Sequence, residues 1–105
     1  MSISTHVLDS VTGRPAVGVA VRLFAGEDLL AEGVTGRDGR CRLTEEATGM
    51  GIHRLVFATG PWFTEQARDA FYPEVVLTFV VLEPADHHHV PLLLAPFAYS
   101  TYRGS

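Results

Sequence analysis

Turn-forming residues interrupt this chain at intervals of about ten residues, and this spacing constrains the fold more than any other feature. Between the interruptions lie short runs rich in β-branched and aromatic residues, and helical periodicity is almost absent. In one such run Val19, Val21 and Leu23 fall on the same face, which is the period-2 pattern of a half-buried strand. Short strands at even spacing are typical of an all-β sandwich or barrel.

We expect about eight strands and one short helix. The strands are expected at residues 3–8, 17–24, 29–34, from 40 onward, 53–58, 75–82, 87–94 and 98–103. Asp38 and Gly39 predict a hairpin turn, because both residue types tolerate positive φ. An acidic, glycine-bearing loop is expected at 45–51, and Thr64 is expected to cap a helix over 64–70.

Length, charge and cysteine content limit the class of protein. At 105 residues and 47% hydrophobic content we expect one domain over residues 1–105. A net charge of -4 without a Lys/Arg cluster argues against a nucleic-acid partner. Cys41 is the only cysteine, which excludes an intrachain disulfide and favours a reducing cytoplasm. With no signal-peptide pattern and no apolar stretch of about 20 residues, we expect a cytoplasmic protein without a membrane partner.

Three of the five histidines are consecutive. In a strand, His87 and His89 would share one face and His88 would point to the other. Such a pair can begin a metal site, with Cys41 or His6 as a further ligand. It can also serve acid–base catalysis near neutral pH, or consist of hydrogen-bonded surface residues without a chemical task. The residues alone leave these three interpretations open.

Two further side chains could join such a site. His6 shares a face of the first expected strand with Ser4 and Leu8, although a single histidine in a strand is more often structural. Arg40 follows the Asp-Gly turn and is by default a solvated side chain. Beside histidines, its planar guanidinium could bind a carbonyl or an anionic oxygen. Cys41 is more typical of a small buried hydrophobe than of a thiol nucleophile.

The C-terminal segment keeps a strand-like, aromatic character to its last residues. Chain ends usually fray into polar tails. The segment from Tyr99 to Ser105 therefore suggests a docked end that presents Arg103, the Ser105 hydroxyl or the terminal carboxylate to a site. A plain edge strand is the alternative.

Several segments along the chain carry a family resemblance. They are residues 4–9 with 12–16, 38–40, 59–60 with Phe63, 71–74, 87–94 and the terminal 99–105. Together they resemble the transthyretin-related 5-hydroxyisourate hydrolase family over nearly the whole chain. The ending Tyr-Arg-Gly-Ser and the histidine at position 6 are the most specific, because hormone-carrying transthyretins have lost both. His88, where the family often has an aromatic residue, and Phe97-Ala98 depart from the pattern.

The resemblance implies a fold and an assembly. The fold is an all-β, transthyretin-like sandwich of two four-stranded sheets with one short helix. The implied assembly is a homotetramer, a dimer of dimers in which paired protomers extend their sheets edge to edge. The active sites would line the channel between the dimers.

The resemblance also implies an activity. This is hydrolysis of 5-hydroxyisourate to 2-oxo-4-hydroxy-4-carboxy-5-ureidoimidazoline in urate degradation, without a cofactor or a metal. The catalytic set would be His6, Arg40, His89 and Ser105, and His6, Arg40, Ser105, Tyr102 and Arg103 would bind the substrate. A recurrent family histidine of unsettled role matches His87. The competing hypotheses are a non-catalytic small-ligand carrier and a zinc hydrolase that uses His87, His89 and His6.

Overall fold

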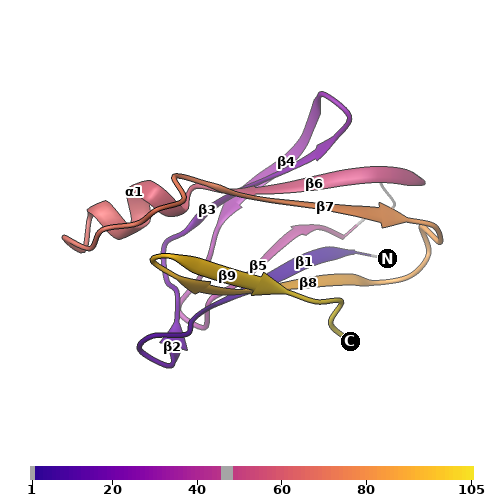
Figure 1. Ribbon diagram of the computed structural model, residues 1–105. Helices are drawn as coiled ribbons and strands as arrows, with labels where there is room; N and C mark the ends of the chain where they lie inside the picture. The colour runs from indigo at the N-terminus through magenta and orange to yellow at the C-terminus, as the bar shows by residue number, and fades with distance from the viewer. Residues whose placement is uncertain (1, 46–48) are drawn as a thin grey trace.

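Two β-sheets packed face to face make up the computed structural model, which describes residues 2–45 and 49–105 (Figure 1). The five-stranded sheet contains β1 (Ile3–Asp9), β2 (Arg14–Pro15), β5 (Arg40–Thr44), β8 (His88–Ala95) and β9 (Ala98–Thr101). The four-stranded sheet contains β3 (Ala20–Ala25), β4 (Asp28–Val34), β6 (Gly51–Phe57) and β7 (Val75–Val81). The predicted sandwich is confirmed, and the two-residue β2 adds a fifth strand to one sheet.

Strand β1 lies in the middle of the five-stranded sheet. It pairs with β8 in parallel on one side and with β5 and β2 antiparallel on the other, while β9 forms the edge beyond β8. The parallel register places Ser4 opposite His89 and His6 opposite Pro91. The antiparallel register places His6 opposite Arg40. Residues from the beginning, middle and end of the chain therefore meet on adjacent strands.

The core fills the space between the sheets, and alternation along the strands decides which side chains enter it. Val21 and Leu23 of β3 are fully buried, as their spacing predicts. On β1, Thr5 and Val7 point inward, and Ser4, His6 and Leu8 occupy the opposite face. The largest fully buried side chains are Phe57, Phe63, Ile3, Leu23 and Leu55. Each contributes roughly 1.5–3 kcal/mol of transfer free energy.

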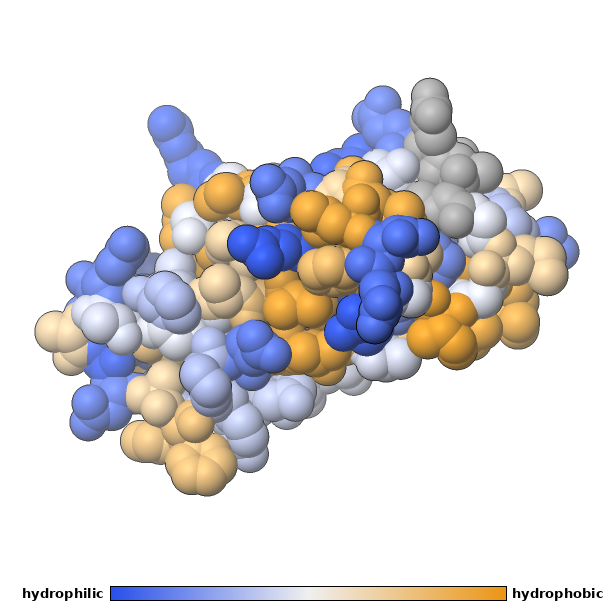
Figure 2. Space-filling view, turned by 90° about the horizontal axis from the view of Figure 1, so that it is seen from above, coloured by the Kyte–Doolittle hydropathy of each residue, from blue (hydrophilic) through white to orange (hydrophobic). Residues whose placement is uncertain are grey.

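The outer face of the four-stranded sheet is mixed in polarity. Figure 2 shows apolar residues gathered across the middle of this face and hydrophilic residues around them. Val76 and Val80 of β7 and Ile52 of β6 are 37%, 46% and 58% exposed. Apolar atoms make up more than half of the accessible surface of ordinary globular proteins.

The helix lies earlier in the chain than predicted. The helix α1 spans Thr59–Thr64, so Thr64 ends it rather than capping its start, and its hydroxyl donates to the Gly60 carbonyl. The prediction was wrong because side-chain packing outweighs the helix propensity of residues 66–68. Phe63 is buried in the core, and the Trp62 indole N–H donates to the Val17 carbonyl at 2.7 Å. Ala67 then adopts φ 54, which stops the helix.

The Asp-Gly turn forms but does not join a hairpin. Gly39 has φ 80, and its N–H donates to the Gly36 carbonyl. The preceding strand β4 pairs with β3 in one sheet, whereas β5 pairs with β1 in the other. The turn therefore carries the chain from one sheet to the other. Local turn chemistry specifies a reversal, and the partner of the following strand depends on long-range contacts.

Most strand boundaries agree with the prediction to within one or two residues. The exception is β3, which begins at Ala20 rather than at residue 17. Gly18 has φ 88 and its N–H donates to the Thr35 carbonyl, so the chain is still in a turn there. The final strand ends at Thr101. Of the predicted loop at 45–51, residues 46–48 lie outside the described part of the chain.

Candidate active site

Three side chains proposed for catalysis project from the same outer face of the five-stranded sheet. His6 comes from β1, Arg40 from β5 and His89 from β8. Their neighbours along the strands, Thr5, Cys41 and Val90, are buried in the core. Because successive residues of a strand point to opposite faces, the three catalytic candidates point away from the core. The charges of Arg40 and His6 both act on His89. The sheet therefore brings two imidazoles and a guanidinium together.

The position of Arg40 depends on the turn before it. The Val7 N–H donates to the Gly39 carbonyl at 2.8 Å, so the turn is tied to β1. A Cβ at Gly39 would collide with the Val7 carbonyl oxygen and would lie 3.1 Å from Pro15 Cβ. Only glycine combines this close approach with φ 80. The turn thus fixes Arg40 opposite His6.

Asp38 links the turn to both His6 and Arg40. The His6 Nε2–H donates to the Asp38 carbonyl at 2.8 Å. A carbonyl can only accept, so in neutral His6 the proton is on Nε2 and Nδ1 is left as the acceptor. The Arg40 Nε lies 3.8 Å from Asp38 Oδ2, and both side chains are more than half exposed. Such a surface pair is weak, so the guanidinium remains available to bind a ligand.

The surroundings of His89 favour its uncharged form. Burial lowers its pKa below the usual 6.5, and the positive charges of Arg40, His87 and His6 lower it further. At neutral pH the ring is therefore uncharged and can accept a proton. The Ser4 hydroxyl lies 2.8 Å from His89 Nδ1, which leaves Nε2 for a substrate or a water molecule.

The C-terminal tail docks on His89. The Gly104 N–H donates to the His89 carbonyl at 2.8 Å, and the Thr101 hydroxyl donates to the Pro91 carbonyl at 2.6 Å. A Cβ at Gly104 would lie 2.5 Å from His89 Cδ2, so the tail backbone lies directly against the ring. Ser105 follows immediately. The terminal residues therefore reach the same face as the histidines.

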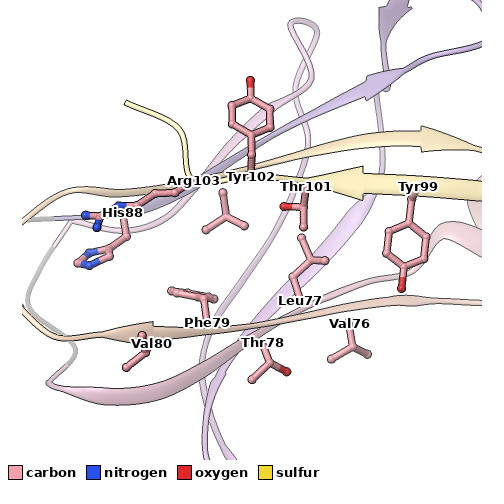
Figure 3. A pocket seen from close by; sticks show the side chains of 11 residues that line it. Val76, Leu77, Thr78, Phe79, Val80, His88, Tyr99, Thr101, Tyr102 and Arg103 are labelled. Carbon is pink, nitrogen blue, oxygen red and sulfur yellow. The ribbon is translucent and has the colours of Figure 1, made fainter.

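Tyr102 and Arg103 line a different space. A cavity of about 490 Å³ lies at the sandwich edge between β7 and the β8–β9 pair (Figure 3). Its other lining residues include Leu77, Phe79 and His88. In Figure 3 the Tyr102 ring points away from the cavity, in the direction opposite to the Tyr99 ring, whereas Arg103 extends toward His88. Of the predicted substrate-binding residues, Arg103 therefore lies at the sheet edge rather than on the outer face with His6 and Arg40.

The remaining sequence candidates also have definite positions. His88 points inward and is 5% exposed, and its Nδ1–H donates to the Asp86 carbonyl. Cys41 is buried, and burial raises the pKa of its thiol, which is the opposite of what an activated nucleophile needs. Within residues 2–45 and 49–105, no group of three His, Cys, Asp or Glu side chains is placed to hold a metal ion.

Two serines next to the histidines had no role in the sequence-based hypothesis. Ser4 contacts both His87 and His89, and Ser2 contacts His87. The available signal was the placement of Ser4 on the face of His6. What the sequence could not reveal was the parallel pairing of β1 with β8, which brings Ser4 beside His89.

The chain is similar to several known proteins over nearly its whole length. A 5-hydroxyisourate hydrolase of Salmonella dublin is 42% identical over 109 residues, which cover 98% of this chain and 80% of the relative. The solved structure of Klebsiella pneumoniae 5-hydroxyisourate hydrolase superposes with a TM-score of 0.93 at 39% identity and covers 100% of both chains. Sea bream transthyretin in complex with thyroxine gives a TM-score of 0.88 at 28% identity, covering 99% of this chain and 95% of that one.

The family model agrees with these pairwise likenesses. The model described as the HIUase/Transthyretin family matches residues 3–104, nearly the full chain. The match spans both sheets, the turn before Arg40 and the tail as far as Gly104. This chain therefore belongs to the HIUase/Transthyretin family.

Proposed function

We propose that this chain hydrolyses 5-hydroxyisourate to 2-oxo-4-hydroxy-4-carboxy-5-ureidoimidazoline in urate degradation. The observation that carries the proposal is the shared outer face of His6, Arg40 and His89, with the C-terminal tail docked against His89. The hydrolase names of relatives near 40% identity support the same substrate. No cofactor enters the proposed reaction.

The chemistry opens a six-membered ring at a carbonyl–nitrogen bond. Water adds to the carbonyl carbon while a histidine takes one of its protons, and the tetrahedral adduct then breaks its carbon–nitrogen bond. The leaving nitrogen receives a proton and becomes part of a ureido group. The new carboxylic acid ionises at neutral pH, so each turnover releases one proton to solvent.

The residues divide these tasks by their charge states. Uncharged His89 suits the general base, a role typically worth about 10²–10⁴-fold in rate. After taking a proton from water, His89 can pass it to the leaving nitrogen, and His6, held through its Nε2–H, presents Nδ1 to the substrate as an acceptor. Arg40 stabilises the carbonyl oxygen as negative charge develops. Ser105 and the tail position the heterocycle, and Tyr102 and Arg103 assist binding by fixing that tail.

The decisive experiment follows the ultraviolet decay of freshly generated 5-hydroxyisourate. We expect wild-type protein to accelerate the decay with or without a chelator. Replacing Arg40 by alanine should lower kcat/KM about 10²–10³-fold, as removal of one oxyanion donor does in other enzymes. Arg42→Ala is the matched control, because Arg42 lies on the same strand and face but pairs with Glu45.

Each alternative predicts a different outcome of this assay. Decay no faster than in buffer, together with tight binding of an aromatic ligand, would indicate a carrier. Activity abolished by chelation would indicate a zinc hydrolase that uses His87, His89 and His6. Equal activity of the two arginine variants would contradict the assigned site while leaving the activity itself intact.

We further propose a homotetramer formed as a dimer of dimers. The edge strands β7 and β9 carry exposed apolar residues, with Val80 46% and Tyr99 40% exposed, and the cavity between these edges is lined mainly by apolar side chains. Pairing of such edges between two protomers satisfies backbone groups and covers this surface. Light scattering should give four times the chain mass, and a lower value would contradict the proposal.

The compartment we propose is the cytoplasm. The single cysteine is buried and free, which fits a reducing environment. In the described part of the chain, no helix has the length and apolar character needed to span a bilayer. Cell fractionation followed by immunoblotting tests the assignment, and recovery in an exported fraction would contradict it.

A further inference from the structure

We infer that Ser4 and His87 are positioning residues that keep the proton of His89 on Nδ1, so that Nε2 faces the substrate as a proton acceptor. This inference rests on the proposed function. Neither Ser4 nor His87 contacts the reacting atoms. Both act through His89, because the tautomer of a histidine is set by the bond that its other ring nitrogen makes.

A row of alternating hydroxyl and imidazole groups carries the inference. The Ser4 hydroxyl lies 2.8 Å from His89 Nδ1 and 3.3 Å from His87 Nε2. The Ser2 hydroxyl contacts His87 Nδ1. The two imidazole rings are nearly parallel, with centroids 6.1 Å apart and an interplanar angle of 15°. Ser4 is therefore the single hydroxyl that bridges the two histidines in the described part of the chain.

Burial makes this bridge consequential. Ser4 is 9% exposed, whereas His87 is exposed to solvent. A shielded hydroxyl has little access to water, so it donates its one proton to one of these two ring nitrogens. If Ser4 donates to His87, its oxygen must accept from His89 Nδ1–H. If Ser4 donates to His89, the proton of His89 must be on Nε2.

Whether His87 Nε2 carries a proton decides between these two arrangements. Neutral His87 can present Nε2 as an acceptor while its Nδ1–H donates to Ser2. This arrangement draws the Ser4 proton away from His89 and leaves the His89 Nε2 lone pair available. Protonated His87 has only donors. Its Nε2–H must then point at Ser4, which turns its own proton toward His89 Nδ1 and blocks His89 as a base.

Other charged groups lie around this row. The charges that act on His89 include those of Arg40 from β5 and His6 from β1, in addition to His87 itself. Other ionisable groups are present on the neighbouring segments, namely Arg42, Asp86 and Arg103. Arg42 is paired with Glu45. All of these groups remain unchanged when only His87 is replaced.

The test compares two replacements of His87 that differ in their ability to accept a hydrogen bond. His87→Gln provides an amide oxygen, whereas His87→Phe fills the space without an acceptor. We expect His87→Phe and Ser4→Ala to lower kcat/KM about 10–100-fold, the loss that follows when the hydrogen-bond partner of a metal-ligating histidine is removed in other proteins. His87→Gln should keep most of the activity. Ser10→Ala is the matched serine control, because its hydroxyl donates to Leu94 at the far end of the same strands.

The pH profile provides a readout that a merely structural role would not change. The acid limb of log kcat/KM reports His89, and the charge of His87 helps to lower the pKa of that ring. Removing the charge should therefore move this limb toward higher pH in both His87→Gln and His87→Phe, whereas only His87→Phe should also lower the plateau. An unmoved limb in both variants, or equal plateaus of kcat/KM for His87→Phe and His87→Gln, would overturn the inference.

A second measurement does not depend on turnover. The nitrogen chemical shifts of His89, recorded by NMR, distinguish the Nδ1–H from the Nε2–H tautomer. We expect the Nδ1–H form in the wild type and a shift toward Nε2–H in His87→Phe. An inactive wild-type protein with these tautomers would contradict the proposed function only. An active wild type whose His89 tautomer is the same in His87→Phe would overturn the inference only.

Discussion

Replacing Asp9 by asparagine should destabilise the fold by about 2–3 kcal/mol at neutral pH. The Asp9 side chain is 4% exposed and binds Arg68 at 2.8 Å, and it also accepts the N–H groups of Val11 and Thr12. Hydrogen bonds to a charged group contribute about 1.5–3 kcal/mol each, and breaking a buried ion pair costs about 3–5 kcal/mol. We use the lower part of this range because Arg68 is 23% exposed and the amide oxygen of the introduced asparagine can still accept from the backbone.

The pH dependence follows from the same contacts. Burial alone would raise the pKa of Asp9, but Arg68 and the N–H groups of Thr12 and Val11 outweigh it, so the pKa lies below the ordinary 3.8. A lowered folded-state pKa means that the carboxylate stabilises the fold above about pH 3.8. This stabilisation is lost as the pH falls through the folded-state pKa. The difference between wild type and Asp9→Asn should therefore shrink on acidification.

Thermal unfolding at fixed protein concentration measures both effects. At pH 7 a loss of this size corresponds to a Tm lower by roughly 10 °C for a chain of this length. Asp28→Asn, at an exposed position in β4, is the control and should change Tm little. A Tm difference for Asp9→Asn that is negligible at pH 7, or just as large near pH 2, would refute the reasoning.

Three other predictions concern the site and its support. Because the pKa of His89 is lowered, the acid limb of kcat/KM assigned to it should lie below pH 6.5, and a limb centred above that value would contradict His89 as the base. Gly39→Ala should destabilise the protein and lower its activity more than Gly13→Ala, because an added Cβ meets backbone at Gly39 but open space at Gly13. Equal losses of the two variants in urea titrations and kinetic assays would exclude this clash. Cys41, buried and with a raised pKa, should react with iodoacetamide only after unfolding, as mass spectrometry can check; rapid labelling of the native protein would contradict its burial.

Regular alternation made the strands predictable, whereas packing decided the features that sequence reasoning missed. The face assigned to Val21 and Leu23 is confirmed, because a half-buried strand must place every second residue in the core. The helix was misplaced because the docking of Trp62 and Phe63 outweighs local propensity. The strand after Gly39 joins the opposite sheet because its partner, β1, is distant in sequence.

The candidate site was predictable as a set of residues but not as an arrangement. The family resemblance singled out His6, Arg40 and His89, and the registers of β1 with β5 and β8 bring them to one face. The tail was expected to dock, and Gly104 does bind His89. The bridging position of Ser4 could not be predicted, because it depends on which strand lies beside β1 and on its register.

The parallel pairing of β1 with β8 also has a consequence for biosynthesis. It joins residues 3–9 to residues 88–94, two segments far apart in the sequence. Such distant pairings form slowly and leave early segments without their partners. On the ribosome, β1 can pair with β5 early but with β8 only after residues 88–94 have emerged. His89 therefore joins Ser4 and His6 late, and the candidate site is assembled only once β8 has been made.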